Sequence, residues 1–269
     1  MSAMGDIFPG PLFTDLYELT MAAAFHEEGH NPPATFSLFV RPPRQGDPWG
    51  YLVAAGLEAV LDALEGFGFD DGDIAYLKAT GLFETSFLDM LAGLRFSGSV
   101  DAMPEGTVCF PNEPLLEVTA PLIEAQLLET YLINTMGLAT LLTTKASRCV
   151  EAAGGRVGRP LIDFSLRRTQ GSAAGMAASR AAYLAGFAAT SNVLAGKRYG
   201  IPLAGTMAHS FVQAFGDEAA AFEAYARTFP QRTILLIDTY DALSGARGAL
   251  DLARKLRDGG RRLVGVRLD

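Results

Sequence analysis

The chain has 269 residues, of which 49% are hydrophobic and 19% are charged. This composition is sufficient for one large domain or two medium-sized domains with packed cores, and it excludes a disordered chain. The formal net charge of −8 disfavours nucleic acid and anionic membranes as partners, although a few arginines can still bind a small anion.

The N-terminal segment, the apolar runs and the cysteines bear on the cellular location. Residues 1–10 lack a basic start and an apolar core, which argues against a signal peptide. No apolar run reaches the roughly 18 residues of a membrane span. Cys109 and Cys149 have no CxxC spacing and no neighbouring histidine, so we expect both to be reduced and buried and to bind no metal. We therefore expect a cytoplasmic protein with no membrane or nucleic-acid partner.

The first half of the chain predicts an α+β arrangement. Apolar residues at helical spacing follow a start signal at Asp15, and residues 34–41 alternate as a strand does. Residues 50–68 pass from a short strand into an amphipathic helix. Residues 96–121 are rich in proline, glycine and β-formers, which indicates short antiparallel strands. A long apolar helix is expected over about 122–142.

From residue 143 onwards, helices alternate with short apolar strands. The helices are expected at 143–155, 172–187, 193–200, 217–230 and 242–260, and the strands at 159–168, 189–192, 201–210, 232–241 and 261–269. This alternation indicates βα units around a parallel sheet, and the length of the series favours a barrel over a small open sheet. We therefore predict an N-terminal α/β domain at 1–138 and the first part of an α/β barrel at 139–269.

Polar and reactive side chains follow each predicted strand of the second part. They are Asp163 and Arg167, Ser191 and Asn192, His209 and Ser210, Asp238 and Asp241, and Arg267 and Asp269. In parallel α/β folds the carboxyl ends of the strands face the active site. The pattern therefore predicts a catalytic rim with His209 at its mouth. Asp241 is also expected to cap the helix that follows it.

Several motifs, in their order and spacing, resemble the nicotinate phosphoribosyltransferase family over nearly all of the chain. They are TDLYELTM (14–21), GYLVAAGLEAVL (50–61), ETYLINTMGLATLLTTKASR (129–148), DFSLRR (163–168), TSNVLAG (190–196), GTMAHSF (205–211), DTYDAL (238–243) and GVRLD (265–269). The resemblance implies the fold of a type II phosphoribosyltransferase, with an α+β N-terminal domain followed by an irregular α/β (TIM-like) barrel that is incomplete here.

The resemblance also implies an activity in NAD biosynthesis. Nicotinate and phosphoribosyl pyrophosphate give nicotinate mononucleotide and pyrophosphate, coupled to ATP hydrolysis and assisted by Mg²⁺, in a homodimer with a shared active site. Family members continue from the GVRLD motif into Ser-Gly-Asp and further strands, so we expect this chain to be truncated at its C-terminus relative to the family.

The resemblance assigns a role to several residues. His209 matches the histidine that ATP phosphorylates, and an imidazole is a competent nucleophile toward phosphorus. Asp238 and Asp269 match the acidic pair that meets the ribose hydroxyls and Mg²⁺, and Arg267 matches the arginine beside the ribose and the nucleotide phosphate. A single histidine is more often structural, and the strand-end position together with the flanking motif reverses that preference.

The remaining assignments concern the pyridine ring and a phosphate. Arg167 matches the arginine that holds the ribosyl phosphate, for which a guanidinium fork is suited. Phe164 and the partner subunit's Tyr17 match the aromatic residues on the two faces of the ring. Phe164 would otherwise be core, and Tyr17 would otherwise be an interface residue. Ser191 stands where nicotinamide-using relatives have an aspartate, so its hydroxyl favours the acid over the amide.

Two alternatives stay open at this point. Quinolinate phosphoribosyltransferase has a related architecture, although a dicarboxylate needs additional basic residues, and the DFSLRR and TSN segments fit a monocarboxylate better. The other alternative is a non-catalytic fragment that only dimerises. Sequence beyond Asp269 would distinguish them. His26 and His30, at the end of the first helix, are expected to be exposed or to cap it.

Overall fold

The computed structural model describes residues 9–41, 50–155 and 158–269. The chain forms two compact units, Met1–Leu203 and Ala204–Asp269, and each has a hydrophobic core of its own. Residues 1–8, within the segment where we expect no signal peptide, lie outside the described part of the chain. Within the described ranges, no helix has both the length and the apolar character needed to cross a membrane.

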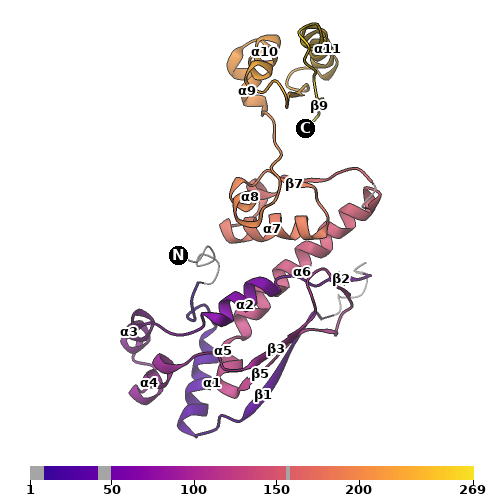
Figure 1. Cartoon of the computed structure of the whole chain (residues 1–269). Helices are drawn as coiled ribbons and strands as arrows, with labels where there is room; N and C mark the ends of the chain where they lie inside the picture. The colour runs from indigo at the N-terminus through magenta and orange to yellow at the C-terminus, as the bar shows by residue number, and fades with distance from the viewer. Residues whose placement is uncertain (1–8, 42–49, 156–157) are drawn as a thin grey trace. The chain divides into compact units, whose positions relative to one another are not determined.

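An antiparallel sheet organises the first part of the first unit (Figure 1). Its strands lie in the order β1 (Pro33–Phe39), β5 (Pro114–Pro121) and β3 (Ser99–Ala102), so β5 has a partner on both sides. Exposure alternates residue by residue along β1, as the period of a strand requires. A second short antiparallel pair joins β2 (Leu52–Val53) to β4 (Val108–Cys109). The expected strands of this part are confirmed.

Six helices accompany these strands. They are α1 (Leu16–Glu27), α2 (Leu57–Glu65), α3 (Asp71–Thr80), α4 (Thr85–Gly93), α5 (Leu122–Leu127) and α6 (Glu129–Ala152). The helix α1 follows Asp15 as predicted. The two helices predicted at 122–142 and 143–155 are divided elsewhere: α5 ends at Leu127, and α6 continues through the predicted boundary at residue 142 to Ala152. No glycine or proline stands at residues 138–152 to end the helix there.

Gly56 brings the start of α2 close to α6. Its φ is +98°, and a Cβ at this position would lie 3.0 Å from the Ala139 Cβ and 3.1 Å from the Met136 Cα. Both the backbone angle and the close approach favour glycine. The Gly56 N–H donates to Glu105 Oε1 at 2.6 Å, which ties the start of α2 to the loop between β3 and β4.

The rest of the first unit consists of βα elements. They are β6 (Ile162–Asp163), the 3₁₀ helix η2 (Leu166–Arg168), α7 (Ser172–Ala185), β7 (Ala189–Thr190) and α8 (Val193–Tyr199). β6 and β7 are parallel, with Asp163 opposite Thr190, and Thr190 forms a further parallel bridge with Leu203. The parallel pairing agrees with the predicted βα pattern. The predicted domain boundary at 138/139 lies inside α6 and stays a prediction.

The second unit contains five elements. They are α9 (His209–Phe215), α10 (Glu218–Thr228), β8 (Ile234–Leu236), α11 (Ala242–Asp258) and β9 (Gly265–Arg267). β8 and β9 pair in parallel, with Leu236 opposite Arg267. The predicted N-cap is confirmed, because the Asp241 carboxylate accepts a hydrogen bond from the Ser244 N–H at 2.8 Å.

Two sequence predictions require correction. The strand expected over 201–210 is reduced to the bridge at Leu203, because Pro202 lacks an N–H for a ladder, and His209 begins a helix instead of ending a strand. Both cysteines are free as expected, but only Cys109 is buried. Cys149 lies on the exposed face of α6, so the expectation of burial is wrong for this residue.

Candidate active site

A buried polar network occupies the carboxyl ends of β6 and β7. Its members Asp163, Ser179, Thr190 and Asn192 are at most 4% exposed. The Thr190 hydroxyl donates to Asp163 Oδ2 at 2.7 Å, and the Ser165 N–H donates to Asp163 Oδ1 at 2.9 Å. The Asn192 side-chain amide donates to Ser179 Oγ at 3.1 Å, and the Asn192 N–H donates to Thr190 Oγ1 at 3.0 Å. The network therefore joins both strand ends to α7.

Asp163 is ionised at neutral pH in this environment. Burial alone would raise the pKa of its carboxyl group, but hydrogen bonding from Ser165, Thr190 and Ser179 outweighs burial and holds the pKa below its ordinary value. A carboxylate that accepts several hydrogen bonds is a strong fixed point, because each of these bonds is charge-assisted.

The network fixes the two loops that carry the predicted substrate residues of the first unit. Phe164 and Arg167 follow β6 and are exposed, with 42% of Phe164 accessible. Ser191 follows β7 and is half-buried, and its N–H donates to the Asp163 carbonyl at 2.8 Å. The Asn192 Oδ1 caps α8 by accepting from the Ala195 N–H at 3.2 Å. The structure thus places these three side chains at the ends of two paired strands.

Tyr17 lies on α1, with 47% of its surface exposed. Its hydroxyl donates to Glu129 Oε1 at 3.0 Å. Partial burial, this hydrogen bond and the carboxylates of Glu129, Glu18 and Asp15 raise the pKa of Tyr17 to about 12. The tyrosine is therefore neutral at physiological pH, with a ring that a second subunit can contact; its role against a bound pyridine stays a prediction.

His209 lies at the start of α9 with both ring nitrogens next to polar groups. Nδ1 is 3.2 Å from Thr239 Oγ1, and Nε2 is 3.6 Å from Asp269 Oδ2. A carboxylate beside Nε2 favours the proton on that nitrogen, which leaves the lone pair on Nδ1 next to the Thr239 hydroxyl. The side chain is 38% exposed, so a ligand in solution can reach the ring.

The other predicted residues of the second unit are connected to His209 through Asp269. Arg267 forms an ion pair with Asp269 at 3.2 Å, and its guanidinium lies 3.5 Å from Thr206 Oγ1. The Asp269 N–H donates to Asp238 Oδ2 at 2.8 Å. The structure therefore brings together an imidazole, a guanidinium and two carboxylates, all within this unit.

The carboxylates of Asp238 and Asp269 fit a magnesium ion in their chemistry. Asp238 Oδ1 is buried and has no hydrogen-bond partner among the described residues. Protein sites for Mg²⁺ commonly supply one or two carboxylates, while water and substrate phosphates complete the octahedron. No group of three or more His, Cys, Asp or Glu side chains in the described ranges is placed to hold a metal by itself.

Sequence reasoning missed several supporting residues. Thr190 and Ser179 complete the network under Ser191, and Thr239 and Thr206 contact His209 and Arg267. Thr190, Thr206 and Thr239 lie within the quoted motifs, and Ser179 lies outside them. No other feature of the sequence marks these residues. A threonine or serine carries no signal of its own, because the same side chain serves equally well on a surface.

Known proteins match this sequence over almost its whole length. A family model described as the nicotinate phosphoribosyltransferase (NAPRTase) N-terminal domain matches residues 12–137. Nicotinate phosphoribosyltransferase pncB2 of Mycobacterium tuberculosis is 52% identical over 249 residues, which are 92% of this chain and 52% of that protein. The chain is therefore similar to nicotinate phosphoribosyltransferases over nearly all of its length.

Further relatives and solved structures show the same similarity. Nicotinate phosphoribosyltransferase of Bacillus subtilis is 44% identical over 260 residues, which cover 96% of this chain and 52% of the relative. The crystal structure of human nicotinic acid phosphoribosyltransferase superimposes with a TM-score of 0.85 at 35% identity, covering 95% of this chain and 61% of that one. The chain spans about half the length of the curated nicotinate phosphoribosyltransferases it matches.

The fold class is confirmed by the same comparisons. Besides the human nicotinic acid phosphoribosyltransferase, nicotinate-nucleotide pyrophosphorylase from Pyrococcus furiosus superimposes with a TM-score of 0.76 over 96% of this chain and 57% of that one. At 24% identity the second likeness concerns the fold alone. The α/β arrangement predicted from the sequence is thus that of the type II phosphoribosyltransferases.

Proposed function

We propose that this chain acts in NAD biosynthesis as a nicotinate phosphoribosyltransferase, as a cytoplasmic homodimer with a shared active site. The reaction joins nicotinate to phosphoribosyl pyrophosphate and releases pyrophosphate. One observation carries the proposal above all: the loop with Phe164 and Arg167 and the loop with Ser191 are both hydrogen-bonded to the same buried residue, Asp163. The similarity to two bacterial nicotinate phosphoribosyltransferases supports the same reaction.

The first unit supplies the proposed site for the pyridine ring. Ser191 donates its hydroxyl to the nicotinate carboxylate, which an aspartate at this position would repel. Phe164 stacks on one face of the ring, and the partner subunit's Tyr17 covers the other. Arg167 holds the ribosyl phosphate through its guanidinium fork. Because Asp163 fixes both loops, the ring is held in one orientation before the reaction.

The bond exchange takes place at C1′ of the ribose. The ring nitrogen of nicotinate forms a bond to C1′ while the bond from C1′ to the pyrophosphate oxygen breaks, so the ring becomes a pyridinium and pyrophosphate leaves. The ribosyl centre gains positive charge on the way, and no protein nucleophile is needed. Asp238 and Asp269 meet the ribose hydroxyls, and Arg267 lies beside the phosphate. These two carboxylates would also hold a Mg²⁺ ion, which would supply positive charge to the departing pyrophosphate.

His209 is the residue that ATP phosphorylates. A neutral imidazole accepts the terminal phosphoryl group of ATP on its lone pair, ADP leaves, and the phosphohistidine is later hydrolysed. Thr239 and Asp269 hold the ring in position for this step. The histidine forms no bond to the sugar or to the pyridine, so its phosphorylation couples ATP to the rate and is not itself the bond-forming step.

A product assay tests the proposal. The purified chain is incubated with phosphoribosyl pyrophosphate, Mg²⁺ and ATP together with nicotinate, nicotinamide or quinolinate, and the products are separated by chromatography. We expect nicotinate mononucleotide and pyrophosphate in equal amounts from nicotinate and little product from the other two. Product from quinolinate with release of carbon dioxide would favour the quinolinate enzyme. Dimerisation without product from any substrate would favour the non-catalytic fragment.

A further inference from the structure

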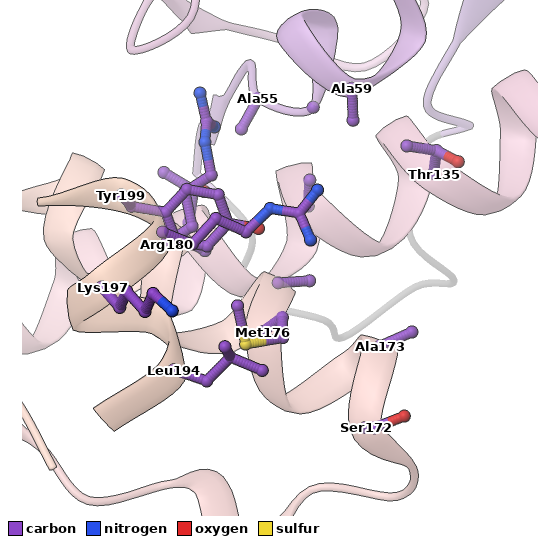
Figure 2. Close-up of a pocket in the computed structure, with 16 residues that line it drawn as sticks. Ala55, Ala59, Thr135, Ser172, Ala173, Met176, Arg180, Leu194, Lys197 and Tyr199 are labelled. Carbon is purple, nitrogen blue, oxygen red and sulfur yellow. The ribbon is translucent and has the colours of Figure 1, made fainter. Parts of the chain in front are cut away.

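A cavity of about 540 Å³ lies within the first unit, among α6, α7, α8 and the residues at the start of α2 (Figure 2). Sites for small molecules commonly have volumes of roughly 300–1,000 Å³. None of the residues assigned above to nicotinate, phosphoribosyl pyrophosphate or ATP lines this cavity. It is therefore a feature that the proposed reaction does not use.

Small side chains create the space. Ala173, Ala177 and Ala181 line the cavity from α7 at intervals of four residues, which places them on one face of that helix. Ala139 of α6 and Ala59 of α2 line it from other sides. A longer side chain at any of these positions would occupy the cavity, so the room follows directly from the residues that face it.

The charged side chains along the cavity are cations. Arg180, Lys197 and Arg198 line it, whereas no aspartate or glutamate does so among the described residues. Arg180 is already paired, with Glu105 at 2.7 Å and with Glu58. Lys197 is exposed, lines the cavity from α8 (Figure 2), and forms no ion pair with any described residue. The cavity therefore offers one available ammonium group to an anion.

An aromatic ring gives this end of the cavity a flat wall. The guanidinium carbons of Arg180 and Arg198 lie 6.0 and 5.9 Å from the centroid of the Tyr199 ring, so cation–π contacts hold the ring. Met176 and Leu194 line the same cavity (Figure 2). A fixed ring with apolar neighbours suits a planar ligand, because the wall needs no rearrangement to accept it.

A buried hydroxyl without a hydrogen-bond partner also points to a ligand in this cavity. Thr143 lines the cavity, is fully buried and has a hydroxyl with no hydrogen-bond partner among the described residues. The nearby Thr140 and Thr144 hydroxyls, by contrast, donate to the carbonyls of Ala55 and Thr140. Buried polar groups are nearly always satisfied.

We propose that this cavity binds an anion with a planar aromatic body. The aromatic body packs against Tyr199, Met176 and the alanines of α7, and the anionic group lies at Lys197. The proposal concerns a second site in the first unit and does not rest on the proposed phosphoribosyl transfer.

Two fluorescent probes of matched shape test this directly on the full chain. Anilinonaphthalene sulfonate has a planar aromatic body with an anionic group, and phenylnaphthylamine has a similar body without charge. We expect one saturable site for the sulfonate. Lys197→Gln is expected to weaken the sulfonate about threefold to fivefold, the scale of one exposed charge pair, and to leave phenylnaphthylamine unchanged. Ala177→Phe, which fills the cavity, is expected to weaken both probes more than tenfold.

Matched variants separate the cavity from general binding. Lys78→Gln removes an exposed lysine of α3, and Ala92→Phe adds an exposed ring on α4; neither is expected to weaken the probes. Excess nicotinate is not expected to displace the sulfonate, and displacement would mean that the probe reports the pyridine site. Equal weakening of both probes by Lys197→Gln, or full binding by a folded Ala177→Phe variant, would overturn the proposal. Because Lys197 is exposed, its variant keeps the test valid if Ala177→Phe does not fold.

Discussion

Replacing Asp163 by asparagine would measure how strongly the buried network holds the two loops. The carboxylate is 4% exposed and accepts from Ser165 N–H at 2.9 Å and from the Thr190 hydroxyl at 2.7 Å. An asparagine keeps one acceptor oxygen and turns an amide group toward the second donor. A hydrogen bond to a charged group contributes roughly 1.5–3 kcal/mol, and a stranded buried donor costs roughly 1–3 kcal/mol. We expect Asp163→Asn to lower the free energy of unfolding by about 3 kcal/mol at pH 7.

The effect has a defined pH dependence. The pKa of Asp163 is lower in the folded chain than its ordinary value of about 3.9 in an unfolded chain. The ionised carboxylate therefore stabilises the fold fully above the unfolded pKa, and this contribution is lost as the pH falls through the folded pKa. Asparagine does not titrate, so the difference between wild type and variant is largest at neutral pH and shrinks in acid.

Urea unfolding followed by far-UV circular dichroism at neutral pH and at a series of acidic values measures this difference. Asp89→Asn, at an exposed position of α4, is the matched control, and we expect it to change stability by less than about 0.5 kcal/mol. If Asp163→Asn behaved like this control at pH 7, or if its effect stayed constant into acid, the network would not hold the loops in the way described.

Three further predictions concern the proposed reaction. Ser191→Asp is expected to weaken kcat/KM for nicotinate by roughly 2–3 kcal/mol, the scale of a buried polar mismatch, and unchanged steady-state kinetics would remove Ser191 from the site. His209→Ala is expected to abolish ATP hydrolysis and the acid-labile, alkali-stable label from labelled ATP while ribosyl transfer continues; a label that maps to another residue would make His209 structural. Sedimentation at micromolar concentration is expected to show a dimer, and a clean monomer would contradict a ring site completed by the partner subunit's Tyr17.

The elements with strong local signals could be predicted from the sequence. Alternation along β1 and the amphipathic residues of α2 and α11 each specify one buried face, so pattern and structure agree. The short helix α3 was missed, although Asp70 and Asp73 form a capping box at its start. The strand predicted at 201–210 failed because apolar composition alone does not supply the backbone partners that a ladder needs.

The sequence predicts which residues follow the strand ends, but it does not predict the contacts between them. The resemblance named His209, Asp238, Arg267 and Asp269, and the structure brings these together within the second unit. The hydrogen bonds that join Asp163 to Thr190, 27 residues later in the chain, depend on parallel pairing that no local pattern reveals. Long-range contacts between small polar side chains are therefore the part that only the fold supplies.

The pairing of β1 with β5 also has a consequence for synthesis on the ribosome. Thr35 lies opposite Thr119, and the two are 84 residues apart in the sequence. At ~5–20 residues per second, β1 is made on the order of 4–17 s before its partner exists. During that time the strand presents unpaired backbone groups, and Pro33 at its first residue and Arg41 just after it are the kinds of residue that discourage pairing with other chains. A nascent chain that ends before β5 is therefore expected to lack this sheet and to depend on such flanking residues to stay unaggregated.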